Sequence, residues 1–213
     1  MSTRICFIRH GETDWNVEKR IQGQIDIPLN ETGRAQALAM AFSAAHHNFD
    51  AIYSSDLMRA RNTAGMLAAR RGLDIKILPK LRERHFGIFQ GLTAAEGKVS
   101  QPEAYAHYIA RDPDYDFVTG ESMHNLVKRV EAAVQEMTQC HAGQIIAAVT
   151  HGGVLDILYR KATGKPLHEP RDFNIPNCAL NWFRFDGNGV DGWHLDAWDD
   201  HHYLAKVIKE SVE

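Results

Sequence analysis

The chain of 213 residues is long enough for one domain, or at most for a core with a lid. Hydrophobic residues make up 44% and charged residues 24%, which is ordinary for a globular protein in water. A formal net charge of −3 argues against a general nucleic-acid binder, whose surface would be basic. The sequence holds no run of about 18 apolar residues, so we expect no membrane span.

The N-terminus and the cysteines indicate a cytoplasmic protein. Residues 1–8 contain neither a long apolar stretch nor a small-residue cleavage site, so we expect no secretory signal. Cys6, Cys140 and Cys178 are far apart and odd in number. They therefore predict neither a zinc site nor a disulfide framework, as is usual in a reducing compartment.

The first part of the chain alternates predicted strands and helices. Residues 4–8 predict a buried strand that ends where Arg9-His10-Gly11 interrupts the apolar run. Residues 34–45, rich in Ala, Leu and Met, predict a helix. A second strand over 51–54 leads into a helix over 55–70, for which Ser54, Ser55 or Asp56 is the expected cap. Residues 75–78 predict a third strand.

The second part of the chain begins with a mixed stretch at 92–125, where we expect one short helix around 103–109 and loops elsewhere. A helix over 123–139 precedes a buried strand over 144–150, and a helix over 154–161 follows. Residues 179–185 and 192–195 predict an antiparallel pair joined by a turn at 186–189. Residues 204–213 predict the amphipathic end of a helix, and the alternative is a tail that closes over the functional site.

This alternation predicts an α/β layered fold with a mostly parallel sheet and one antiparallel edge near the C-terminus. The chain shows no repeats, low-complexity segments or linker. We therefore expect a single domain over residues 1–213, with a lid-like insertion at about 92–125.

Two predicted strands end in a histidine that glycine follows, at Arg9-His10-Gly11 and at Thr150-His151-Gly152. Ligands of open α/β sheets bind outside the carboxyl ends of the strands, so the two histidines are expected to face one site. A single histidine at a strand end is more often structural. Two at equivalent ends, one of them beside Arg9, favour a functional role.

A neutral imidazole is a competent nucleophile toward phosphorus at physiological pH. The transferring phosphoryl group then needs cations around its oxygens, and arginine suits this task because its planar fork of donors is permanently charged. Arg9 and Arg59 are the candidates, although Arg59 alone would be interpreted as part of a solvated helix face. Arg61, Arg70 and Arg71 are expected to be surface charges.

A leaving alkoxide needs a proton, so a general acid is expected as well. Glu83 is the candidate, because it lies just past a predicted strand in a segment that contains glycine. The alternative is a surface carboxylate paired with Arg82 and Arg84, and the sequence leaves both interpretations open.

Together these residues resemble the histidine phosphatase superfamily, in the branch that contains the cofactor-dependent phosphoglycerate mutases. The resemblance covers essentially the whole chain and consists of four blocks in order. The blocks are Arg9-His10-Gly11-Glu12-Thr13 with Trp15-Asn16 and Gln22-Gly23, Ser54-Ser55-Asp56-Leu57 with Arg59-Ala60 and Thr63-Ala64, Glu83 with Phe86-Gly87 and Gln90-Gly91, and Thr150-His151-Gly152-Gly153.

The resemblance implies a three-layer α/β/α sandwich and a role for each matching residue. By position it makes His10 the phosphorylated nucleophile and Glu83 the proton donor. It also implies a phosphate pocket, with Asn16 and Gln22 as phosphate or substrate contacts; its residues are Arg9, Asn16, Gln22, Gly23, Arg59, His151 and Gly152. Members of the family need no metal, which agrees with the absence of metal-ligand spacing in this sequence. The adjacent histidines 46–47 and 201–202 are expected at the surface.

Two enzymatic activities fit this resemblance. A mutase must exclude water from the phosphohistidine, and its longer insert and closing C-terminal tail serve this purpose in the family. Here the segment over 92–144 is short, which favours a phosphatase that acts on small phosphomonoesters. The motif Glu83-Arg84-His85-Phe86-Gly87 is closer in sequence to that of the mutases. A 2,3-bisphosphoglycerate-dependent phosphoglycerate mutase therefore stays the alternative.

A third interpretation is a binding module that keeps the phosphate pocket without catalysis. Its expected mark is the loss of His10, Glu83 or an arginine, and all are present. We therefore expect an enzyme whose partner is a small phosphorylated metabolite, as a monomer or homodimer, with no nucleic acid and no membrane. No cofactor is expected, apart from 2,3-bisphosphoglycerate if the chain is a mutase. The sequence does not identify the substrate.

Overall fold

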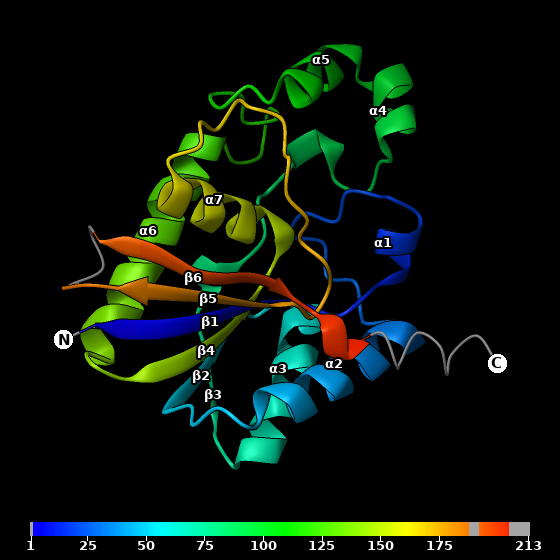
Figure 1. Cartoon of the computed structure of the whole chain (residues 1–213). Helices are drawn as coiled ribbons and strands as arrows, with labels where there is room; N and C mark the ends of the chain where they lie inside the picture. Colours follow the sequence, from blue (N-terminus) through cyan, green and yellow to red (C-terminus); the bar gives the residue numbers. More distant parts are fainter. Residues whose placement is uncertain (1, 188–191, 205–213) are drawn as a thin grey trace.

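A sheet of six described strands runs through the middle of the protein (Figure 1). The computed structural model describes residues 2–187 and 192–204. The strand order is β3-β2-β4-β1-β5-β6, in which β3, β2, β4 and β1 pair in parallel and β5 is antiparallel to both of its neighbours. The strands are β1 (Thr3–Arg9), β2 (Ala51–Ser54), β3 (Ile75–Ile77), β4 (Ile145–Thr150), β5 (Leu180–Phe185) and β6 (Trp193–Asp200). The predicted mostly parallel sheet with an antiparallel region near the C-terminus is confirmed.

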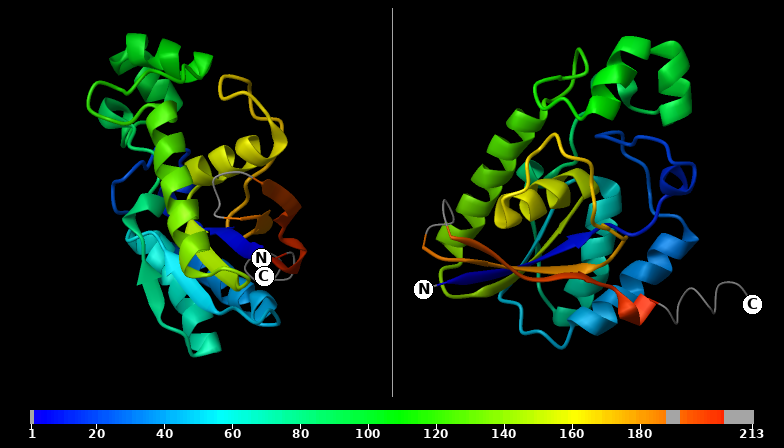
Figure 2. Two further views of the ribbon diagram at one scale, coloured as in Figure 1. Left: turned by 90° about the vertical axis from the view of Figure 1, so that its left-hand side faces the viewer. Right: turned by 45° about the horizontal axis from the view of Figure 1, so that its top comes forward.

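Helices cover both faces of this sheet (Figures 1 and 2). The side chains of β1 alternate between the two resulting cores. Ile5 and Phe7 pack with residues of α6 and α7, whereas Cys6 and Ile8 pack with residues of α2 and α3. The predicted three-layer sandwich is therefore confirmed. The helices are α1 (Asp14–Val17), α2 (Glu31–Ala44), α3 (Met58–Arg71), α4 (Ala94–Ser100), α5 (Pro102–Ala110), α6 (Met123–Cys140) and α7 (Gly152–Thr163), with 3₁₀ turns η1 (Pro79–Leu81), η2 (Gly87–Phe89) and η3 (His202–Leu204).

The helix after β2 begins later than the sequence predicts. It starts at Met58 with Leu57 as its cap residue, and Leu57 offers no side-chain hydrogen bond. Instead, the Asp26 carboxylate accepts a hydrogen bond from the Met58 amide at 2.7 Å. The predicted capping by Ser54, Ser55 or Asp56 is thus wrong, because a residue distant in the sequence satisfies the helix end and Asp56 pairs with Arg82.

The stretch over 92–125 contains two helices rather than the single short one that we predicted. α4 was missed, although Thr93 and Glu96 form a capping box at its start. α4 and α5 form a cap beyond the carboxyl ends of the strands (Figure 2). A small core of Phe89, Ala104 and Phe117 holds the cap together.

Two other predictions concern residues near the C-terminus. The turn predicted at 186–189 falls partly outside the described residues, as does nearly all of the helix end predicted at 204–213. The histidines 46–47 and 201–202 are exposed, as expected. Among the described residues, no helix is long and apolar enough to cross a membrane.

Candidate active site

His10 follows β1, at the carboxyl end of the parallel strands. Its side chain is only 3% exposed, and its Nδ1 lies 2.7 Å from the Gly11 carbonyl oxygen. Because a carbonyl only accepts hydrogen bonds, Nδ1 carries the proton and Nε2 keeps its lone pair. Burial and the charges of Arg59 and Arg9 hold the pKa of His10 well below its ordinary value of 6.5. His10 is therefore a neutral imidazole with a free nucleophilic nitrogen at physiological pH.

His151 follows β4, which pairs with β1 so that Thr150 lies opposite Arg9. This register brings the centroid of the His151 ring to 5.1 Å from that of His10, as the sequence predicts. Burial and Arg59 lower the pKa of His151 well below 6.5 as well. Neither of its ring nitrogens has a hydrogen-bond partner among the described residues. A buried polar ring of this kind is costly unless a ligand oxygen satisfies it.

Arg9, which is partly buried, and Arg59, which is fully buried, bring two positive charges to the same place. Arg9 Nη1 donates to the Ile175 carbonyl at 2.6 Å, and the terminal nitrogens of Arg59 donate to the carbonyls of Gly23 and Ile25. Neither forms an ion pair with a described residue, and the Nε of each has no partner there. Arg59 is 0% exposed, and burial lowers its pKa to about 10. Arg59 is therefore not part of a solvated helix face, the alternative that its position in the sequence suggests.

These two guanidiniums stay charged at neutral pH and are held by carbonyl oxygens, which are only dipoles. Buried charges are costly unless an opposite charge compensates them. The pocket is accordingly built to receive an anion, and a phosphate dianion matches two guanidiniums and an imidazole donor.

Glu83 lies shortly after η1 and is half-buried. The Gly153 amide, in the first turn of α7, lies 3.0 Å from both of its carboxylate oxygens. The Arg84 amide donates to Oε1 at 2.7 Å. The surface ion pair that we considered for Glu83 is absent from the described structure, because Arg82 pairs with Asp56 and the Arg84 side chain donates to backbone carbonyls.

A cavity of about 250 Å³ lies over these groups. Its wall includes Arg9, His10, Asn16, Gln22, Gly23, Arg59, Glu83 and Gly152. Every predicted site residue except His151 therefore lines this one cavity. The ring of His151 lies beside that of His10 instead. Gln22 has an unpartnered buried Oε1. Asn16 uses its Oδ1 to accept from the Thr13 amide at 3.1 Å, which leaves its amide nitrogen available.

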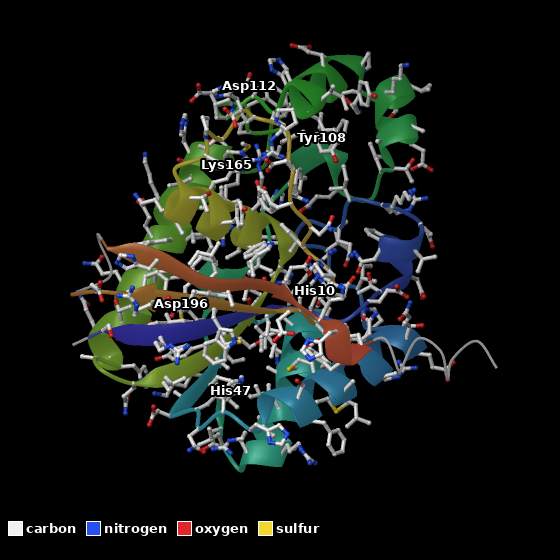
Figure 3. All side chains as sticks on the ribbon, viewed as in Figure 1. His10, His47, Tyr108, Asp112, Lys165 and Asp196 are labelled. Carbon is white, nitrogen blue, oxygen red and sulfur yellow. The ribbon has the colours of Figure 1, made fainter. Side chains whose placement is uncertain are left out.

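Sequence reasoning missed several residues of this cavity, among them Tyr108, Gly153 and Arg171. Tyr108 comes from the cap, above His10 in Figure 3. Arg171 comes from the segment between α7 and β5. Neither belongs to a motif, so no local pattern marked them. Gly153 belongs to the motif Thr150-His151-Gly152-Gly153, but its amide contact with Glu83 depends on the tertiary structure.

Within residues 2–187 and 192–204, no group of three or more His, Cys, Asp or Glu side chains is arranged to hold a metal ion. The positive charge comes from arginine.

Relatives and solved structures that resemble this chain match it over nearly its whole length. "Phosphoglycerate mutase-like protein 4" of Arabidopsis thaliana is 40% identical over 95% of this chain and 87% of its own length. The "Metal-independent phosphoserine phosphatase" of the same plant is 37% identical over 96% of this chain and 84% of its own. The native structure of mycobacterial glucosyl-3-phosphoglycerate phosphatase is 31% identical, with a TM-score of 0.83 over 94% of this chain and all of that one.

The family model of the histidine phosphatase superfamily, branch 1, matches residues 5–201. That span includes His10, His151, Arg9, Arg59 and Glu83. The chain therefore belongs to branch 1 of the histidine phosphatase superfamily.

Proposed function

We propose that this phosphomonoester hydrolase transfers the phosphoryl group of a small metabolite to Nε2 of His10 and then to water. The observation that carries the proposal is the pair of arginines, Arg59 fully buried and Arg9 partly buried, that form no ion pair with a described carboxylate and lie beside a neutral, buried His10. Such a pocket attracts a phosphate dianion and offers it a nucleophile. A binding module would need the arginines but not the free imidazole nitrogen.

In the first step the lone pair of His10 Nε2 attacks phosphorus, and the bond from phosphorus to the leaving oxygen breaks. Glu83, in its protonated form, gives its proton to that oxygen. Arg9, Arg59 and His151 stabilise the charge on the equatorial oxygens. Asn16 and Gln22 add side-chain contacts, and Gly23 and Gly152 let the backbone approach the phosphate.

In the second step Glu83, now a carboxylate, takes a proton from water while the water oxygen attacks the phosphohistidine. The bond from Nε2 to phosphorus breaks, and inorganic phosphate leaves with neutral His10 and protonated Glu83 restored. No metal is required, since arginine supplies the positive charge. A relative whose name states metal independence supports this point.

A phosphatase is favoured over a mutase by the short segment that follows Glu83 and by the relatives named as phosphatases. We also propose that the chain acts as one domain in which the cap at about 92–125 serves as a lid over the site. Cys6, Cys140 and Cys178 are all free, which supports a reducing, cytoplasmic location.

Trapping of the phosphoenzyme tests the proposal. Wild-type protein mixed with a ³²P-labelled phosphomonoester and quenched in alkali should carry label that acid releases, as a phosphohistidine does. His10→Ala should carry none and should lose turnover, while its far-UV circular dichroism stays that of the wild type. His46→Ala, an exposed histidine, is the matched control and should behave as the wild type. Undiminished labelling or turnover of His10→Ala would refute the proposal.

A further inference from the structure

A second cavity adjoins the catalytic one. It has a volume of about 270 Å³, slightly more than the 250 Å³ of the catalytic cavity, and lies between the cap and α7. Phe86, Tyr108, Gly153 and Arg171 line both cavities. Gly153 is the residue whose amide contacts Glu83, so the second cavity opens on the side where the leaving group must depart. We call it the distal chamber.

Arg84 brings a buried positive charge to the distal chamber. The residue is only 7% exposed, and its guanidinium donates to the carbonyls of Glu121 and Tyr115 at 2.7 and 2.8 Å. It forms no ion pair with a described residue. Burial lowers the pKa of Arg84 to about 10, so the group is still charged at neutral pH. As around Arg59, carbonyl oxygens accept the hydrogen bonds of a buried guanidinium. The Arg84 guanidinium also lies over the rings of Phe86 and Phe117, at 5.2 and 5.0 Å from their centroids.

Arg111 and Arg171 add two more positive charges, and they share one carboxylate. Asp156 accepts from Arg111 Nη2 at 2.7 Å, from Arg171 Nε at 3.1 Å and from Arg160 Nε at 3.3 Å. One negative charge cannot neutralise three guanidiniums. The terminal nitrogens of Arg171 make no hydrogen bond to a described residue, which leaves that fork of donors open.

The remaining wall of the distal chamber decides what kind of molecule fits. Asp112, which is labelled in Figure 3, also lines the chamber, and its Oδ2 lies 2.7 Å from Nδ1 of His107. The net charge of the lining is therefore positive. Apolar side chains, among them Phe86, Phe117 and Ile157, form much of the remaining wall, which also includes Tyr108. Such a wall suits a carbon chain that carries an anionic group.

We propose that the distal chamber binds an anionic group on the leaving part of the substrate, separated by a carbon chain from the phosphoryl group that reacts at His10. The preferred substrates are then extended phosphomonoesters that carry a carboxylate or a second phosphate. Asp156 is a positioning residue, which orients Arg111 and Arg171 without neutralising them. This inference rests on the proposed phosphatase function.

The test uses alkyl phosphates of increasing chain length that end in a carboxylate, in a phosphonate, or in an uncharged amide. The wild type should show kcat/KM at least ~10-fold higher for a charged ending than for the amide of equal length, because charge-assisted hydrogen bonds replace neutral ones. One chain length should be optimal. The carboxylate and phosphonate arms identify which anion is preferred, and a preference for either supports the inference.

Arg111→Gln and Arg171→Gln should each lower the ratio of kcat/KM between charged and amide substrates by ~10-fold, mainly through KM. Arg70→Gln, on the exposed end of α3, is the matched control and should keep the ratio of the wild type. Melting temperatures confirm that each variant is folded. Equal kcat/KM for charged and amide substrates in the wild type, with the ratio unchanged in both variants, would refute the proposal that the distal chamber binds an anionic group. It would not contradict the proposed hydrolase function. Failure to hydrolyse any of the phosphates would instead refute the proposed function.

Discussion

Replacement of Gly153 by alanine tests the placement of the general acid. The Gly153 amide lies 3.0 Å from both oxygens of Glu83, and a Cβ on Gly153 would lie only 2.1 Å from Glu83 Oε1. The carboxylate must therefore retreat by roughly 1 Å or more to restore ordinary contact, a displacement that costs about 10²-fold in rate when a catalytic group is misplaced. The clashing atom is the end of a flexible side chain, so the backbone need not move.

The stability of Gly153→Ala should stay close to that of the wild type. Alanine in a helix is more favourable than glycine by about 1 kcal/mol. The weakened hydrogen bond to Glu83 costs about 1 kcal/mol. Because these contributions offset one another, a loss of activity would report the position of Glu83 rather than unfolding. A melting curve checks this point.

The assay compares an alkyl phosphate with p-nitrophenyl phosphate. Protonation of the leaving oxygen matters most for the poor alkoxide leaving group, so Gly153→Ala should lower kcat/KM for the alkyl phosphate by about 10²-fold and for the aryl phosphate by much less. Glu83→Gln should likewise lower kcat/KM more for the alkyl phosphate than for the aryl phosphate. Gly65→Ala, at a helical glycine with nothing within 4 Å of the added carbon, is the matched control and should have the activity of the wild type.

Two results would refute this reasoning. Equal losses on both substrates would mean that the added methyl group blocks the cavity and that Glu83 does not protonate the leaving group. Full activity of Gly153→Ala on the alkyl phosphate would mean that the present position of the carboxylate does not matter.

The other predictions concern metal, product and pH. Activity should survive EDTA, since arginine supplies the charge at the phosphate; loss that magnesium or zinc reverses would contradict the mechanism. With 3-phosphoglycerate and catalytic 2,3-bisphosphoglycerate, release of inorganic phosphate should exceed formation of 2-phosphoglycerate, and the opposite ratio would establish the mutase alternative. Burial and the charges of Arg59 and Arg9 lower the pKa of His10, and burial and Arg59 lower the pKa of His151. Below pH 6.5 the unfolded chain therefore binds more protons than the folded chain. The melting temperature should therefore fall as pH drops from about 7 through 6.5, and this part of the fall should vanish in the His10→Ala, His151→Ala double variant. A double variant that shows the unchanged pH dependence would contradict the lowered pKa values.

Local sequence patterns account for most of the secondary structure and for the centre of the site. Apolar runs of strand length, followed by helix-forming stretches, place His10 and His151 after two strands. Parallel strands meet at the same edge of a sheet, so the rule for ligand sites predicts that these histidines face each other, and their ring centroids lie 5.1 Å apart. Resemblance to a family then assigned Arg9, Arg59 and Glu83 to the same pocket.

Other features depended on residues far apart in the sequence. The amide that begins α3 is satisfied by Asp26, so no signal near the helix marked its true start. α4 is different, because its capping box at Thr93 and Glu96 is local and was readable.

Local patterns are enough to establish which chemical groups stand at the strand ends, because strand length, turn residues and motifs are local properties. How those groups behave depends on contacts between distant parts of the chain. Arg59 is a buried cation rather than a surface charge because the carbonyls of Gly23 and Ile25 enclose its guanidinium. The distal chamber exists because Arg84 and Arg111, near and within the cap, meet Arg171 from the segment after α7. The burial of a side chain and the net charge around it depend on neighbours from all parts of the chain. No short window of sequence contains those neighbours.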